Sequence, residues 1–172
     1  MRAVGHGPTN VAAKLQDLAA TYARRLREHL GANLVSVVLY GSAARGEARR
    51  DSDIDLLVIC EELPAGRFAR LRWLEAAETD VDRDLARLRT EAIDTRLAVI
   101  VRTRREAERT VPLYLDMVED AHLLYDRDGF FAHVLEGLRV KLAALGAERR
   151  RRGRARYWIL KREFTPGEVI EL

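Results

Sequence analysis

The sequence contains few of the residues that define disulfide-linked, zinc-binding or membrane proteins. Cys60 is the only cysteine in 172 residues, which excludes an internal disulfide framework and a thiolate metal cluster. The four histidines are dispersed, with no pair at helical spacing, so nothing supports a zinc site. No apolar run approaches the roughly 20 residues that a membrane-spanning helix requires. A charged fraction of 33% beside an apolar fraction of 48% is instead typical of a soluble globular protein.

The sequence also lacks a segment typical of export. Its first ten residues hold one arginine and no apolar stretch, so we expect a cytoplasmic protein. The formal net charge is only +3, yet arginines concentrate in "ERRRRGRAR" at 148–156. This run has three interpretations, in order of preference: a solvated helix end, a contact for an acidic partner, and a nucleic-acid patch. We therefore do not expect nucleic acid as a partner.

Hydrophobic spacing predicts alternating helices and strands. Apolar residues recur every three or four positions in three segments, which predicts helices over residues 9–30, 65–91 (one long or two shorter) and about 129–150. Short apolar runs bounded by turn residues predict strands over residues 33–40, 52–60 and 94–101, with a short edge strand at 122–126.

Local signals mark several of the predicted helix starts. Residues 8–10, Pro-Thr-Asn, supply a start signal for the first helix. Thr103 with Glu106 has the spacing of a capping box, and Pro112 suits the first turn of a further helix. The C-terminal tail is expected to pack onto the core, because it carries Tyr157, Trp158, Ile159 and Phe164.

This order of elements predicts an α/β protein of the α+β type. We expect a small mixed β-sheet with strand order near 1-2-3, flanked by helices, and a helical C-terminal part. Residues 1–128 would form the main domain, and residues 129–172 a helix and packed tail in the same globular unit. "GSAARG" has neither the glycine pattern of a Rossmann fold nor the Gly-Lys-Ser/Thr ending of a P-loop.

Two aspartates stand two positions apart at the start of the second predicted strand, in "SDIDLLV". Because side chains alternate along a strand, Asp53 and Asp55 should point to the same side, while Ile54 and Leu56 can enter the core. Neighbouring carboxylates repel unless a cation or a proton relieves them. Mg²⁺ or Mn²⁺ suits such a pair, and Mg²⁺ is commonly held by one or two carboxylates plus substrate phosphates. The pair therefore predicts a divalent metal and a nucleotide.

Gly41 and Ser42, at the end of the preceding strand, suit the other end of that nucleotide. A glycine lets the backbone approach phosphate closely, the serine adds a hydroxyl, and the following short helix points N–H groups outward. Each element alone is common in ordinary turns and strand ends. Occurring together with the flanking apolar strands, they favour a site for phosphoryl or nucleotidyl transfer.

"GSAARG" followed by "SDIDLLV" resembles the signature of the DNA polymerase β-like nucleotidyltransferase superfamily, in its small stand-alone prokaryotic branch. The likeness is strong over residues 34–60 and looser on either side. The resemblance implies that Gly41 and Ser42 hold nucleotide phosphates and that Asp53 and Asp55 bind two divalent metals. It also implies a third carboxylate on a later strand, for which Asp94 is the best candidate; the alternative is that Asp94 is a solvated loop aspartate.

Two arginines lie in the connection between the two halves of this signature. Either Arg45 or Arg49 could clamp a phosphate oxygen, and both are also compatible with an ordinary surface position. We take Arg45 as a candidate nucleotide-binding residue.

The resemblance implies an enzyme that moves a nucleoside monophosphate from a nucleoside triphosphate, ATP being favoured, to an acceptor hydroxyl. The acceptor would belong to a protein, such as a HEPN-type toxin, or to a small molecule such as an aminoglycoside. The alternative is a non-catalytic antitoxin or regulatory partner that binds nucleotide with the same fold. The oligomeric state stays open.

Overall fold

The computed structural model describes residues 10–79, 81–153 and 155–161. The predicted start signal at residues 8 and 9 and the tail aromatic Phe164 lie outside these ranges. Across the described residues, no helix combines the length and apolar character needed to cross a membrane.

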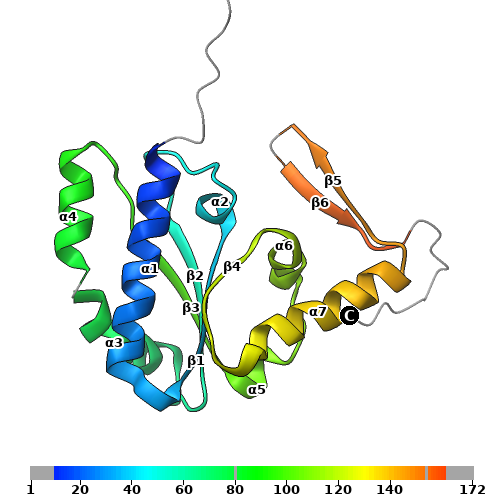
Figure 1. Cartoon of the computed structure of the whole chain (residues 1–172), viewed down its shortest axis with the longest axis horizontal. Coiled ribbons are helices and arrows are strands. Elements are labelled where there is room, and N and C mark those ends of the chain that lie inside the picture. The colour runs from blue at the N-terminus through cyan, green and yellow to red at the C-terminus, as the bar shows by residue number, and fades with distance from the viewer. Residues whose placement is uncertain (1–9, 80, 154, 162–172) are drawn as a thin grey trace, which may run out of the picture.

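A four-stranded mixed sheet forms the centre of the protein (Figure 1). Its strands lie in the order β3-β2-β1-β4, with bounds Leu97–Thr103 for β3, Ile54–Cys60 for β2, Leu34–Tyr40 for β1 and His122–Asp126 for β4. Strand β1 runs antiparallel to β2 and β4, whereas β2 and β3 are parallel. The mixed sheet, its strand order and its edge strand β4 are thus confirmed.

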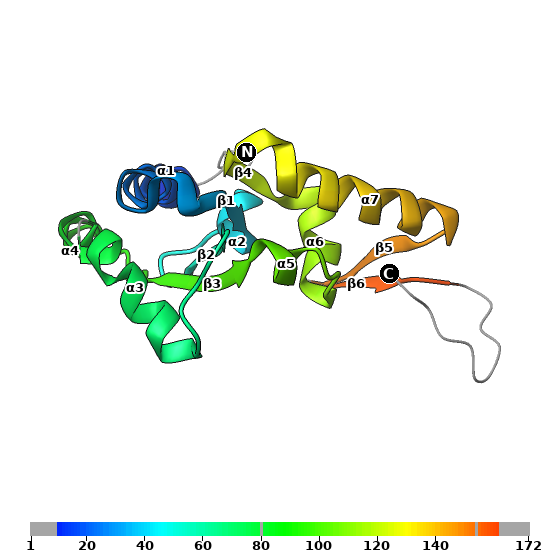
Figure 2. The same cartoon turned by 90° about the horizontal axis from the view of Figure 1, so that it is seen from below.

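Helices cover both faces of this sheet (Figure 2). On one face lie α1 (Asn10–Leu30), α3 (Arg67–Thr79) and α4 (Asp82–Thr90), and on the other lie α5 (Arg104–Ala107), α6 (Pro112–Asp120) and α7 (Phe130–Ala144). The two central strands are buried almost throughout, so both of their faces contribute to the core. This explains why their sequences are apolar almost throughout rather than alternating.

Several local predictions are confirmed. Two helices, α3 and α4, replace the single long alternative for residues 65–91. The Thr103 side chain accepts a hydrogen bond from the Glu106 backbone, and the Glu106 carboxylate accepts one from the Thr103 backbone, which completes the capping box. Pro112 occupies the first turn of α6. For the tail the expectation holds in part: Trp158 packs against the core cluster that contains α6 and α7, whereas Tyr157 is exposed.

The prediction of a helix over residues 129–150 is wrong at its C-terminal end. Helix α7 stops at Ala144, and the arginine run forms an antiparallel hairpin of β5 (Glu148–Arg152) and β6 (Ala155–Ile159). Gly146, with φ +64°, provides the left-handed backbone that commonly ends a helix. The arginine run is therefore not a solvated helix end.

A short helix and a strand boundary determine how the candidate residues are placed. Helix α2 (Gly41–Ala44) follows β1 directly, so the glycine–serine pair lies at the end of that strand. Strand β3 begins at Leu97 rather than at Asp94, which places Asp94 in the connection before the strand.

Candidate active site

Gly41 and Asp55 are in direct contact across the sheet. Tyr40 pairs with Asp55 in the β1–β2 ladder, and the Asp55 carboxylate lies against the backbone of Gly41. A Cβ at Gly41 would overlap Asp55 Oδ2 and would lie 3.0 Å from Asp55 Cγ. Gly41 also has φ +74°, a backbone conformation that side-chain-bearing residues rarely adopt. Position 41 therefore requires glycine both for its backbone and for the space that the carboxylate fills.

The two aspartates lie in different electrostatic environments. Burial raises the pKa of Asp55, the charge of Asp53 raises it further, and Arg45 opposes both effects. Asp53 is held by Arg96, whose Nε lies 3.1 Å from each carboxylate oxygen and whose Nη2 lies 3.1 Å from Oδ2. The structure thus brings Asp53 and Asp55 close enough to repel, and it neutralises Asp53 with an arginine.

This carboxylate pair fits a divalent cation with a preference for oxygen ligands. Asp55 is half-buried and lies against the backbone of Gly41. Burial and the neighbouring charge of Asp53 make its ionised form unfavourable without a cation. Over the described ranges, no group of three or more His, Cys, Asp or Glu side chains gathers as a metal site. A bound Mg²⁺ would therefore take ligands from Asp53 and Asp55 and complete its shell with substrate phosphates and water.

A cavity of about 400 Å³ adjoins the glycine–serine turn. It is lined by Ser42, Glu47, Arg49, Ser52 and Arg151. The cavity thus lies between the connection that carries the candidate residues and the β5–β6 hairpin.

Arg45 lies beside this cavity in a small network of charges. Its Nε lies 3.1 Å from a Glu47 oxygen, and its Nη1 lies 3.8 Å from Asp120. Because Arg45 also lowers the pKa of Asp55, its guanidinium is near enough to act on the carboxylate pair. Its role in nucleotide binding stays a prediction.

Asp94 lies in the connection before β3, outside the strand that pairs with Asp55. Its side chain is exposed, and its backbone N–H donates to the Arg50 carbonyl at 2.7 Å. The β3 residue paired with Asp55 is Ala98, and no residue of β3 is acidic. Asp94 does raise the pKa of Arg96, so its charge acts on the same arginine that holds Asp53. The assignment of Asp94 as third carboxylate remains a prediction.

Sequence reasoning missed Arg96 and Glu47. Arg96 precedes β3, and its carbonyl accepts a hydrogen bond from the Ile54 backbone, which places it beside Asp53. Finding it requires the register of two strands that are distant in the sequence. Glu47 contacts Arg45 and Arg156, and only the position of the hairpin reveals the second contact.

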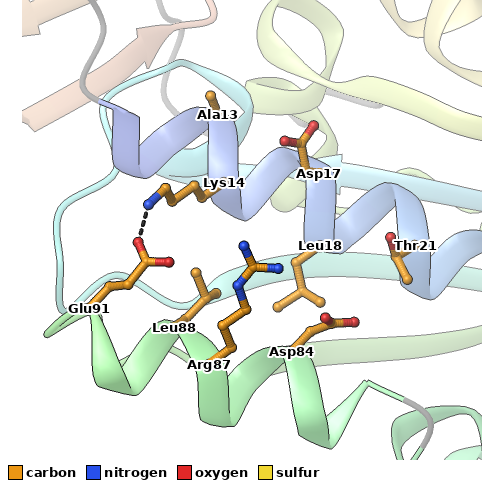
Figure 3. A pocket seen from close by; sticks show the side chains of 9 residues that line it. All are labelled: Ala13, Lys14, Asp17, Leu18, Thr21, Asp84, Arg87, Leu88 and Glu91. Atoms are coloured by element: carbon orange, nitrogen blue, oxygen red, sulfur yellow. Dashed lines mark hydrogen bonds and ion pairs between the residues drawn. The ribbon is translucent and has the colours of Figure 1, made fainter.

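Figure 3 shows a second cavity, a groove of about 390 Å³ between α1 and α4. Charged side chains of both signs line it, and Lys14 forms an ion pair with Glu91 across it. None of the candidate residues lines this groove.

The sequence model of the nucleotidyltransferase domain matches residues 20–125, which include the glycine–serine pair and both aspartates. A Methanocaldococcus jannaschii protein, provisionally named a protein adenylyltransferase, is 28% identical over 127 residues, covering 73% of this chain and 81% of its own length. Protein adenylyltransferase MntA of Thermococcus cleftensis is 38% identical over 65 residues, covering 38% of this chain and 60% of its own length.

A solved structure of a tri-AMPylated Shewanella oneidensis HEPN toxin in complex with MNT antitoxin contains a chain that aligns with 77% of this one. The alignment covers 92% of that chain, with 15% identity and a TM-score of 0.43. Because the domain model spans most of the sequence and includes the whole signature, this chain belongs to the nucleotidyltransferase domain family and is a nucleotidyltransferase.

Proposed function

We propose that this nucleotidyltransferase depends on Mg²⁺ or Mn²⁺ and uses ATP to adenylylate a hydroxyl group on a partner protein. The observation that carries the proposal is the half-buried Asp55 carboxylate, seated against Gly41 and next to Asp53. Burying a carboxylate beside a second one is unfavourable unless a cation binds there. The adjoining cavity at Ser42 gives the phosphates of a nucleotide a place to bind.

The proposed reaction is an in-line displacement at the α-phosphorus. The acceptor oxygen forms a bond to this phosphorus while the bond to the oxygen bridging toward the β-phosphate breaks, and pyrophosphate leaves with that electron pair. Ser42 and Arg45 would hold the phosphates, and Asp53 and Asp55 would hold the metal. When bound, the metal would polarise the α-phosphoryl group and neutralise developing charge. The acceptor's proton passes to a general base.

Asp94 is proposed as that base, reaching the site from the connection before β3. Asp94→Asn should then leave the affinity for Mg²⁺ with ATP nearly unchanged and lower transfer by about 10²-fold or more. Asp51→Asn is the matched control, because Asp51 is another exposed aspartate in a neighbouring connection. Wild-type turnover in Asp94→Asn would remove Asp94 from the mechanism.

A protein acceptor is supported by the two curated relatives, both of which are named for protein adenylylation. A HEPN-type toxin, which the resemblance to the superfamily's small prokaryotic branch implies as a partner, is the proposed acceptor. Its hydroxyl-bearing side chains would enter at the exposed end of the carboxylate pair.

Isotope transfer tests this proposal. The chain, co-expressed with its partner, is incubated with Mg²⁺ and ATP labelled at either the α- or the γ-phosphate. Adenylylation transfers the α-label to the partner protein and releases the γ-label with pyrophosphate. Asp55→Asn should transfer neither label. Transfer of the γ-label would indicate a kinase, and a partner that acquires no label would favour the non-catalytic alternative.

A further inference from the structure

The β5–β6 hairpin runs back from the end of α7 past α6 (Figure 1), and its residue Arg151 lines the cavity beside Ser42. Directly opposed residues of an antiparallel pair share a face, and alternate residues return to it. One face therefore carries the pairs Arg149–Trp158 and Arg151–Arg156. Trp158 packs on the core and Arg149 bonds to Asp120 at 2.9 Å, which identifies this face as the inner one.

Acidic residues of the protein body neutralise two of the three arginines on the inner face. Arg149 is paired with Asp120, and Arg156 forms two hydrogen bonds to Glu47, at 2.9 and 2.5 Å. This pairing lowers the pKa of Glu47 to about 2, chiefly through the hydrogen bond from Arg156. These contacts hold the hairpin against the connection that follows Ser42.

Arg151 differs from the other two. Its Nε donates to the Gly153 carbonyl at 2.8 Å, and no described carboxylate forms an ion pair with its guanidinium. It lies directly opposite Arg156, and like charges at opposed positions of a ladder are destabilising. Arg49, on the other side of the cavity, likewise has no acidic partner among the described side chains. Two arginines without an acidic partner among the described residues therefore line the cavity beside Ser42, together with the Glu47 carboxylate, which Arg45 and Arg156 neutralise.

We propose that the hairpin forms the far wall of the nucleotide site and that Arg151, together with Arg49, binds the β- and γ-phosphates of the nucleoside triphosphate. The inference rests on the proposed function, since it assigns further residues to the same site. Guanidinium groups bind phosphate oxygens through paired hydrogen bonds. A polyphosphate would therefore supply the negatively charged partner that Arg151 lacks among the described residues. The cavity of about 400 Å³ lies within the size range of small-ligand pockets.

This assignment makes the hairpin a determinant of selectivity for triphosphates. AMP has neither of the phosphates that Arg151 would contact. Arg151 should therefore contribute to the affinity for ATP and not to the affinity for AMP. The hairpin also lies outside residues 20–125, the part of the chain that matches the nucleotidyltransferase domain. Arg151 is therefore a contact that the domain signature alone does not predict.

Calorimetric titration of the full chain with Mg²⁺–ATP, AMP and inorganic tripolyphosphate tests the proposal. Arg151→Ala should weaken the binding of ATP and of tripolyphosphate by about 10-fold or more and leave the binding of AMP unchanged. Arg152→Ala is the matched control, because Arg152 is in the same hairpin but on its opposite face. This control should bind all three ligands as the wild type does. Arg151→Gln provides a second variant that keeps a side chain of similar length, and melting temperatures confirm that each protein is folded.

The outcomes distinguish failure of this inference from failure of the proposed function. If the wild type binds Mg²⁺–ATP and Arg151→Ala binds it equally well, the hairpin assignment is overturned and the proposed function stands. If Arg152→Ala weakens ATP binding as much as Arg151→Ala does, the loss reflects the total positive charge of the hairpin rather than a specific contact, and the assignment is also overturned. In a parallel titration with single-stranded RNA, weaker RNA binding by Arg151→Ala with unchanged ATP binding would overturn the assignment and make the hairpin a nucleic-acid contact. A wild type without affinity for ATP would overturn both.

Discussion

At the scale of single residues, the contact between Gly41 and Asp55 determines the properties of the site. A carboxylate can be half-buried at the start of β2 because the facing backbone position has no side chain. The same arrangement brings Ser42, the next residue, to the edge of the adjoining cavity. The proposed metal ligand and the proposed phosphate contact thus lie together where the end of β1 meets the start of β2.

Gly41→Ala should disable the site without unfolding the protein. The new Cβ would displace the Asp55 carboxylate, and a misplacement of about 1 Å can cost about 10²-fold in rate. Gly31→Ala is the control: Gly31 has φ +52° but no atom within 4 Å of an added Cβ, so it reports backbone strain alone. Both variants should lose a similar amount of stability in thermal melts. Equal transfer activity in the two variants would refute the role of the Asp55 contact.

Arg96→Ala should strengthen divalent-metal binding. Arg96 holds the Asp53 carboxylate that a metal would use, so its removal eliminates a competing cation. Because the arginine side chain is 79% exposed, the gain in Mn²⁺ affinity should be modest, about 5-fold or less. Arg102→Ala, at the other end of β3, should bind Mn²⁺ as the wild type does. Weaker metal binding in Arg96→Ala would instead show that Arg96 holds Asp53 in a conformation suited to the ion.

The residues that could be predicted from the sequence are those whose spacing is local. Gly41, Ser42, Asp53 and Asp55 occupy a single short stretch, and the apolar runs around them indicate two strand ends that meet. Arg96 could not be found in this way, because its contact depends on the parallel pairing of β2 with β3. The role of Asp94 could not be decided for the same reason.

At the scale of elements, the arginine-rich hairpin departs most from expectation. Arginine is compatible with helices, so the sequence predicted that the start of the arginine run continues the helix that became α7. Gly146 and Gly153, both with positive φ, instead end the helix and turn the chain back. Ion pairs from β5 and β6 to Asp120 and Glu47 then fix the hairpin against the body. Such long-range pairing is invisible to local propensity, whereas the apolar periodicity of α1 and the central strands predicted those elements correctly.

The hairpin's attachment should depend on pH through Glu47. Its pKa is lowered from the ordinary 4.5 to about 2 by Arg156, so the folded state favours the charged form. The stabilisation is therefore present above about pH 5 and is lost as the pH falls toward about 2. Glu47→Gln should lower the melting temperature at neutral pH and reduce this acid dependence. Identical pH profiles for the variant and the wild type would show that the ion pair contributes nothing to stability.

At the scale of the whole molecule, the sheet carries two apolar clusters, one on each face. Helices α1, α3 and α4 cover one cluster and α6 and α7 cover the other, so the strand ends are held from both sides (Figure 2). Neither Asp53 nor Asp55 belongs to either cluster. Substituting them should therefore change ligand binding while the fold persists.

The most direct test of the central claim is the melting temperature of the chain with and without Mg²⁺ and ATP. A ligand that binds only the folded state raises this temperature, and metal with nucleotide should raise it more than either alone because the phosphates complete the metal's coordination. The wild type should show this combined shift, and Asp53→Asn and Asp55→Asn should lose it while remaining folded. An equal shift in the wild type and both variants would contradict the assignment of the two aspartates as metal ligands.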